Sequence, residues 1–270
     1  MTTAAIIACE MIADETLLAL ERAWPAANRP PLVWIESSLH ERPTKLKAAL
    51  QELIDQLDAG ARTGESVTVH GVRLGEGPAA ERRELVKVEP VGDLLLGFGY
   101  CGGGLEGLVS RERRLALLAA DDCIGALLCR DCETGQVERD AHSYYFTSGW
   151  LRHPGFVGSV DDWLKKHGPE KARRMWRLMF AGYERVSLID TGAYNLEEWL
   201  PRSLARAAEW ELQHCVVPGS VEALAQLFAG QWDGGGIIVL EPGQSMGLEY
   251  LLSPTARDTN RPARSQAQGG

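Results

Sequence analysis

The feature that most constrains the fold is a regular alternation of short apolar runs with longer helical stretches. Residues 4–8 and 32–35 are apolar runs of strand length, and each is followed by a stretch with helical character. In the second of these stretches, Leu46, Leu50 and Leu53 recur at the spacing of one helix face. Strands that alternate with helices favour parallel sheets that are covered by helices on both faces. The sequence therefore predicts an α/β fold of the Rossmann-like type.

The same order recurs in the second half of the chain, so a duplicated architecture is expected. Further apolar runs of strand length lie at residues 93–98, 115–120, 143–146, 186–189, 215–217 and 237–240. Four strands in each half predict two similar lobes, residues 1–140 and 141–250, although one eight-stranded sheet would give nearly the same pattern.

Two segments depart from this alternation. Residues 61–91 are polar and contain glycine, and they are expected to form an insertion with a hairpin through residues 66–72. The tail, residues 254–270, is rich in arginine, serine, glutamine and glycine and is expected to be disordered.

Composition narrows the classes of partner and compartment. The 270 residues carry a net charge of −9, which argues against a nucleic-acid partner. The sequence holds neither a signal-peptide pattern nor an apolar run of the roughly 20 residues that span a bilayer, so a cytoplasmic protein without a membrane partner is expected. A reducing compartment leaves metal binding, catalysis or burial as explanations for the six cysteines.

Thiols and one imidazole follow the strands of the first half. Cys9, His40, Cys101 and Cys123 each lie a few residues beyond the end of an expected strand. Because ligands of parallel α/β folds bind beyond the carboxyl ends of the strands, we expect these four side chains to share one site. Three thiols and an imidazole are the ligands of zinc or of an iron–sulfur cluster, and the cluster is slightly preferred.

The neighbours of these residues fit such a site. Gly102 and Gly103 allow the backbone to approach a bulky or anionic group, and the helix that follows would direct amide groups towards it. Asp121 and Asp122 are candidates for proton transfer or for orienting the ligands.

Structural roles remain open for each of these residues. Cys9 could be a buried residue of a sheet edge, Cys123 could begin a helix, and His40 could cap the helix that starts near Pro43. Cys129 and Cys132 form a local C-x-x-C at the end of an apolar helix rather than at its start, so a structural or incidental role is favoured.

The second half supplies hydrogen-bonding and aromatic groups at its expected strand ends. Tyr145 and Asp190 are candidate catalytic groups, although the tyrosine could instead pack in the core and the aspartate could cap a helix. Candidates for holding a small polar substrate against the metal are Thr147, Ser148, Trp150, Thr191 and Tyr194.

Several of these segments, taken in order, carry a family resemblance. They are Ile7-Ala8-Cys9, Leu39-His40 with Pro43 and Leu46, Leu95-Leu96-Gly97-Phe98-Gly99-Tyr100-Cys101-Gly102, Asp121-Asp122-Cys123-Ile124, Tyr144-Tyr145-Phe146-Thr147-Ser148-Gly149-Trp150 and Ile189-Asp190-Thr191-Gly192. Together they resemble the domain-of-unknown-function 1638 family of bacteria and methanogenic archaea. The departures are the 61–91 insertion, Phe98 in place of a tyrosine and Cys129 in place of a glycine.

The family name supplies no activity, but the resemblance implies a context. Such proteins accompany corrinoid-dependent methyltransferases and other one-carbon enzymes, which makes a corrinoid protein or a methyltransferase the implied partner. The first hypothesis is therefore a metalloenzyme that acts on a small polar molecule in methyl or one-carbon metabolism. A non-catalytic metal or cofactor carrier for such a partner is the alternative, and a metal-free thiol protein is a third possibility.

Overall fold

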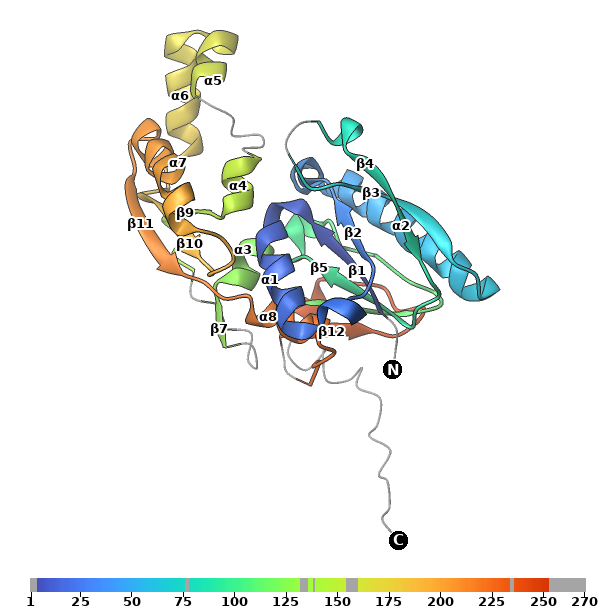
Figure 1. The fold of residues 1–270 in the computed structure, drawn as a ribbon. Coiled ribbons are helices and arrows are strands. Elements are labelled where there is room, and N and C mark those ends of the chain that lie inside the picture. Colours follow the sequence, from blue (N-terminus) through green and yellow to red (C-terminus); the bar gives the residue numbers. More distant parts are fainter. Residues whose placement is uncertain are drawn as a thin grey trace.

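The computed structural model is an α/β structure with two parallel sheets. It describes residues 4–75, 78–131, 136–137, 139–153, 160–233 and 236–252. A five-stranded sheet and a three-stranded sheet form separate lobes that lie side by side (Figure 1). The predicted α/β fold with Rossmann-like parallel sheets is confirmed.

The larger sheet contains four parallel strands and one antiparallel edge strand. The spatial order is β12-β6-β5-β1-β2, and β12 runs antiparallel to β6. The strands are β1 (Ala4–Cys9), β2 (Leu32–Ile35), β5 (Asp93–Gly97), β6 (Arg114–Leu118) and β12 (Ile237–Leu240). Every residue of β1 and β5 is buried, as expected of central strands that are covered on both faces.

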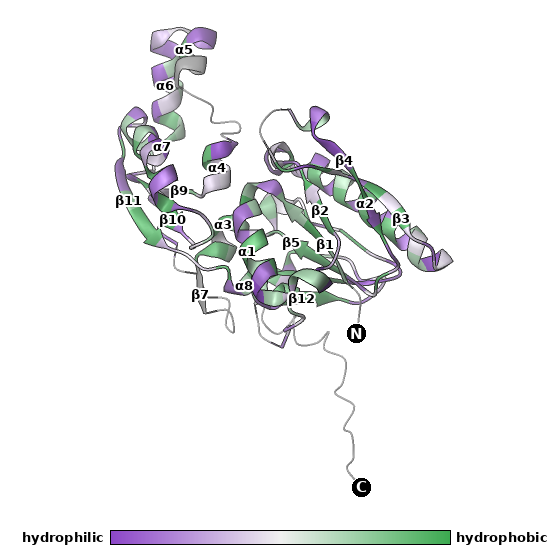
Figure 2. Ribbon diagram, in the orientation of Figure 1, coloured by the Kyte–Doolittle hydropathy of each residue, from purple (hydrophilic) through white to green (hydrophobic). Residues whose placement is uncertain are grey.

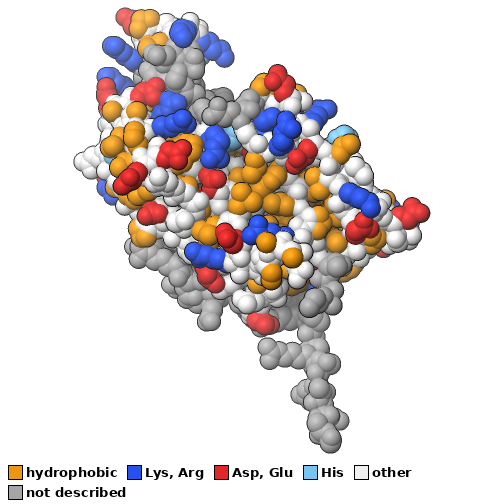
Figure 3. Space-filling model, in the orientation of Figure 1, with side chains coloured by type: hydrophobic (Ala, Val, Ile, Leu, Met, Phe, Trp, Pro, Cys, Tyr) orange, Lys and Arg blue, Asp and Glu red, His pale blue; other side chains and the backbone are white. Residues whose placement is uncertain are grey.

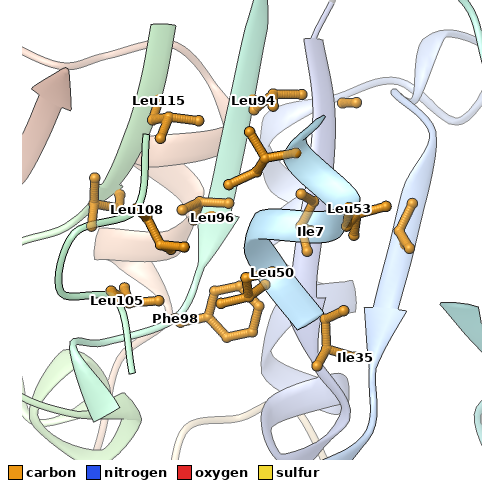
Figure 4. Packing of buried hydrophobic residues seen from close by; sticks show 14 of the residues in the cluster. Ile7, Ile35, Leu50, Leu53, Leu94, Leu96, Phe98, Leu105, Leu108 and Leu115 are labelled. Atoms are coloured by element: carbon orange, nitrogen blue, oxygen red, sulfur yellow. The ribbon is translucent and has the colours of Figure 1, made fainter. Parts of the chain in front are cut away.

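Helices cover both faces of this sheet. Helix α2 (Pro43–Thr63) packs on one face, where Leu50 and Leu53 meet Ile7 and Leu96 (Figure 4). Helices α1 (Ala13–Ala23) and α8 (Glu222–Phe228) share the opposite face with Ile6. Adjacent residues of β1 thus point to opposite faces, which is the period-two alternation of a strand. Each fully buried aliphatic side chain contributes about 1.5–3 kcal/mol to the free energy of unfolding.

The smaller sheet consists of three parallel strands in the order β11-β10-β9. Aromatic rings of this lobe pack together, with the Phe180 and Trp210 ring centroids 4.3 Å apart. The elements of the lobe are β9 (Ser143–Phe146), α4 (Ser148–Arg152), α5 (Val160–His167), α6 (Pro169–Met179), β10 (Arg185–Asp190), α7 (Leu196–Glu209) and β11 (Gln213–Pro218). Figure 2 shows hydrophobic residues along the strands and a predominantly hydrophilic α5 and α6.

The last part of the chain returns to the first lobe, which differs from the expected four-plus-four division. Strand β12, expected in the second lobe, pairs with the edge of β6, and α8 packs against α1. The two sheets therefore contain five and three strands. A four-residue apolar run indicates a strand, but it carries no information about which sheet edge the strand joins.

The segment expected to be an insertion contains an antiparallel hairpin, but residues 66–72, expected to form the whole hairpin, supply only its first strand. Its strands are β3 (Val67–Val72) and β4 (Arg83–Val88), and β3 packs beside β2 and α2. The remaining short elements are α3 (Cys123–Leu127), β7 (Cys129–Asp131), β8 (Gln136–Val137) and α9 (Glu249–Leu252). The predicted disordered tail, 254–270, lies outside the described residues.

In the parts of the chain that the structure describes, no helix combines the length and the apolar character needed to cross a bilayer. Figure 3 shows hydrophobic side chains near the centre of one face, over α1 and β2, with charges of both signs around them.

The lobes meet through the carboxyl ends of their strands. Thr147, which follows β9, donates a 3.4 Å hydrogen bond to the carbonyl of Met11, which follows β1. The backbone amide of Ser220, after β11, donates a 2.8 Å bond to the carbonyl of Leu127. Gly149 lies so close to the first lobe that a Cβ added there would be 2.0 Å from the Met11 carbonyl oxygen.

The close approach at Gly149 predicts that one added methyl group lowers the stability of the protein. Gly149→Ala should lower the free energy of unfolding by about 2 kcal/mol, because backbone in both lobes must move. Gly182→Ala is the matched control, since nothing lies within 4 Å of its added Cβ, and it should change stability by less than about 0.5 kcal/mol. Chemical denaturation measures both, and equal stabilities of the two variants would contradict this account of the lobe contact.

Candidate functional site

Three thiols come together at the carboxyl ends of neighbouring strands in the larger sheet. Cys9 ends β1, Cys101 lies in the turn after β5, and Cys123 begins α3 after β6. The sulfur atoms of Cys101 and Cys123 are 3.8 Å apart. The Cys9 thiol interacts electrostatically with both of the others. The structure therefore brings Cys101 and Cys123 into contact, with Cys9 near enough to interact electrostatically with both.

The proximity of the thiols depends on the turns after β5 and β6. A Cβ at Gly99 would lie 2.2 Å from the carbonyl carbon of Asp122, so only glycine permits this approach. The amide of Cys101 donates a 3.0 Å hydrogen bond to the carbonyl of Asp121. Cys101 has a φ of +49°, a left-handed conformation that non-glycine residues seldom adopt and that is enriched at functional sites.

The three thiols differ in acidity because their surroundings differ. The hydrogen bond with Cys101 lowers the pKa of Cys123. Burial opposes this by raising the pKa, and a hydrogen bond from the Gly99 amide lowers it further, so that the pKa of Cys123 lies below its ordinary value. The same sulfur–sulfur hydrogen bond raises the pKa of Cys101, and burial raises the pKa of Cys9. Cys123 is thus the preferred thiolate, and Cys101 is the thiol that donates to it.

The predicted fourth ligand, His40, has other contacts. Its Nδ1 atom forms a hydrogen bond with the carbonyl of Ser37, and its ring meets Trp150 edge-on with the centroids 4.9 Å apart. Within the described residues, no three His, Cys, Asp or Glu side chains converge as a ready-made metal-ligand set. The four-ligand set therefore stays a prediction.

The acidic pair after β6 has a structural role in this structure. Asp122 is the N-cap of α3 and accepts a 2.7 Å hydrogen bond from the Gly125 amide. Arg139 lies 2.9 Å from the Asp122 carboxylate and 3.3 Å from that of Asp121. These contacts satisfy the carboxylates, and the predicted role in proton transfer stays a prediction.

The predicted substrate-binding glycines lie in the loop beside Cys101. Gly102 and Gly103 have φ values of +62° and +91°, so this loop requires their conformational freedom. A Cβ added at Gly103 would find no atom within 4 Å. The loop is therefore open at that position, and its contact with a ligand stays a prediction.

The candidates that follow β9 lie at the contact between the lobes. Tyr145 is buried, and its hydroxyl accepts a 2.9 Å hydrogen bond from the Asp140 amide. Ser148 donates a hydrogen bond to the carboxylate of Asp14. The indole N–H of Trp150 is buried and has no hydrogen-bond partner among the described residues.

The candidates that follow β10 lie at the same contact. Asp190 is exposed and accepts a 3.1 Å hydrogen bond from the Gly192 amide. Thr191 donates to Glu15 at 3.4 Å, and the hydroxyl of Tyr194 donates to the Ile189 carbonyl. Of these three residues, Thr191 forms a hydrogen bond with the other lobe, and a role of Asp190, Thr191 and Tyr194 in a site stays a prediction.

The C-x-x-C pair contributes nothing to this site that can be described. Cys129 begins strand β7, and Cys132 lies outside the described residues. Cys215 lies in β11 and is partly exposed, with its sulfur 3.0 Å from the Ser187 hydroxyl.

Sequence reasoning missed one member of the site, Glu15. This residue lies in the first turn of α1 and is 0% exposed, and its burial raises the carboxyl pKa to about 7. One carboxylate oxygen accepts the bond from Thr191, and the other has no hydrogen-bond partner among the described residues. The burial of Glu15 could have been predicted from the helical periodicity, because Ile12, Glu15 and Ala19 fall on one buried face of the helix.

The fold and the thiols define a two-lobed α/β protein with a cysteine site where the carboxyl ends of its parallel strands meet. The family model described as "Protein of unknown function (DUF1638)" matches residues 78–228. The chain belongs to this family, as the sequence resemblance indicated. No curated protein matches the chain, and no solved structure matches it.

The burial of Glu15 predicts a pH dependence of stability. The carboxyl pKa of about 7 in the folded protein exceeds the ordinary value of 4.5, so the folded state binds the proton more tightly. The free energy of unfolding should therefore fall as the pH rises from about 4.5 to about 7, by roughly 3 kcal/mol in all. Below about pH 4.5, Glu15 is protonated in both the folded and the unfolded state, and the full stability is present.

Chemical denaturation of Glu15→Gln at pH 5 and pH 8 tests whether Glu15 causes this pH dependence. The amide cannot ionise, so the variant should lack this fall in stability, whereas Glu21→Gln, an exposed position on the same helix, should retain it. The same pH dependence in wild type and Glu15→Gln would show that another group titrates.

Proposed function

We propose that the protein is a metal–thiolate protein in which Cys9, Cys101 and Cys123 bind a soft metal centre at the contact between the lobes. The observation that carries this proposal is the 3.8 Å separation of the Cys101 and Cys123 sulfur atoms. Cys9 lies close enough to interact electrostatically with both and would supply a third thiolate. His40 is the proposed fourth ligand.

The sulfur separation supports one metal atom shared by two thiolates. In a tetrahedral zinc site with Zn–S bonds of about 2.3 Å, two thiolates lie about 3.8 Å apart. In a four-iron cluster each cysteine binds a different iron, so the sulfurs lie farther apart. The geometry thus supports zinc, or a single iron atom that both cysteines bind, over the four-iron form of the iron–sulfur cluster expected from the sequence.

The acidity of the thiols also suits a metal centre. Cys123 has a lowered pKa and is prepared to bind as the thiolate. Cys9 and Cys101 have raised pKa values, so each would release its proton when the metal binds. A bound zinc would act as a Lewis acid that activates a thiol or water nucleophile.

The protein's own groups fit an enzyme that acts on a small polar substrate. Tyr194 and Thr191 from the second lobe and Glu15 from the first lie on the same contact as the thiols. Closure of this contact by both lobes would keep water away from the reacting atoms. The proposed catalytic groups are Asp121, Asp122, Tyr145 and Asp190, and the loop at Gly102 and Gly103 is proposed to bind the substrate.

The family resemblance supplies the proposed biological setting. We place the reaction in methyl or one-carbon transfer, with a corrinoid protein or methyltransferase as the partner. The free state of the described cysteines fits a reducing compartment, and the cytoplasm is the proposed location.

Metal analysis of anaerobically purified protein tests this function. Wild type should retain roughly one zinc per chain, and Cys101→Ser or Cys123→Ser should reduce the metal to about a tenth of that, because half of the shared thiolate pair is lost. A brown protein that contains iron and sulfide would support the cluster instead.

The matched control for these variants is Cys215→Ser, a free cysteine in β11 that should keep the wild-type metal content. Cys132→Ala should also leave the metal content unchanged. Folded wild type that binds neither zinc nor iron would refute the proposal, and loss of metal in Cys215→Ser alone would mean that the wrong thiols were assigned.

A further inference from the structure

Glu15 is a buried carboxylate that has capacity for one more hydrogen bond. It is 0% exposed at the start of α1, and one of its oxygens is held by the Thr191 hydroxyl at 3.4 Å. The other oxygen, Oε2, is buried and has no hydrogen-bond partner in the parts of the chain that the structure describes. An unsatisfied buried carboxylate oxygen is costly, so a ligand that donates a hydrogen bond to it would bind favourably.

The charges around this carboxylate are mainly negative. Burial raises the pKa of the Tyr194 hydroxyl most, and the negative charges of Glu15, Asp190 and Asp14 raise it further, so all three carboxylates act on this hydroxyl. The charge of Glu15 also acts on Cys123, so the carboxylate interacts electrostatically with both the tyrosine and this thiol. The neighbouring cation, Arg152, is already engaged.

The engagement of Arg152 leaves these carboxylates with a negative excess. Its guanidinium lies 3.1 Å from the Asp14 carboxylate, and it also lies over the Trp199 ring at 5.1 Å. The charge of Arg152 also acts on Glu15, but among the described residues neither Glu15 nor Asp190 forms an ion pair with it. A positively charged ligand would therefore be attracted to this part of the lobe contact.

The hydrogen-bonding state of these groups distinguishes an organic cation from a metal ion. Asp14 already accepts from Ser148 and Arg152, and Asp190 accepts from the Gly192 amide. One buried oxygen, Oε2 of Glu15, remains to receive a ligand directly. Magnesium and calcium require several oxygen ligands, whereas an ammonium group carries three N–H donors, one of which can form a charge-assisted hydrogen bond to Oε2.

We propose that Glu15 binds the ammonium group of a small amine through its Oε2 atom, beside Cys123 and within the negative potential of Asp14 and Asp190. This inference rests on the proposed function, since it names the substrate class of the thiolate site. Thr191 fixes the orientation of the carboxylate by holding its other oxygen. The amine would enter between the carboxyl ends of the two sheets.

Saturation-transfer NMR with three probes of similar size tests this site. At pH 8, where Glu15 with its pKa of about 7 is mostly ionised, wild type should bind ethylammonium in preference to neutral ethanol and anionic acetate. Glu15→Gln keeps the shape of the side chain but loses its charge, so ethylammonium should bind at least about tenfold more weakly. Thr191→Val should also weaken binding, because it frees the carboxylate to rotate.

Two controls keep the result specific. Glu21→Gln removes the same charge from an exposed position of α1 and should bind ethylammonium as wild type does. Thermal unfolding confirms that each variant is folded. Equal binding of ethylammonium by wild type and Glu15→Gln, preferred binding of ethanol or acetate, or a magnesium titration that shifts the same resonances and is lost in Glu15→Gln would overturn the proposal.

The test separates this inference from the proposed function. A double variant with Cys101→Ser and Cys123→Ser, which cannot hold the metal, should still bind ethylammonium, because Glu15 is intact. Amine binding without any metal in wild type would refute the metal site alone. Metal in wild type without any amine binding would refute the amine site alone.

Discussion

The arrangement of the site depends on one backbone contact, between Gly99 and the carbonyl of Asp122. Two neighbouring parallel strands end together, but their side chains meet only when the following turns approach closely. The missing Cβ of Gly99 allows this approach, and the amide of Cys101 is then bonded to the Asp121 carbonyl. The result is a pair of sulfur atoms at the separation expected for a shared metal ion, with Cys9 supplied by the adjacent strand.

The second constraint is the meeting of the two sheets at their carboxyl ends. Gly149 packs against the Met11 carbonyl, and Thr191 reaches Glu15 across the same contact. Because both lobes contribute their strand ends, the buried carboxylate of Glu15 in one lobe interacts with Thr191 and Tyr194 of the other as well as with Cys123. This arrangement is the basis of the proposed amine site.

The sequence predicts which segments form helices and strands better than it predicts which strands pair with one another. Alternation of residues 4–57 predicted strands, helices and the parallel sheet, because the hydrophobic period is a local property. The three thiols could also be predicted, since strand ends of a parallel sheet share one edge. The pairing of β12 with β6 could not be predicted, because the sequence of a four-residue strand does not specify which sheet edge it joins. Glu15 was missed because an acidic residue in a first helical turn is ordinarily exposed, where it interacts favourably with the helix dipole.

X-ray absorption at the zinc edge of the purified protein is the most direct measurement of the central claim. The account predicts sulfur neighbours at about 2.3 Å from the metal, with the signal lost when Cys101 and Cys123 are replaced by serine. A first shell made only of nitrogen and oxygen atoms would contradict the claim that these two cysteines share a metal.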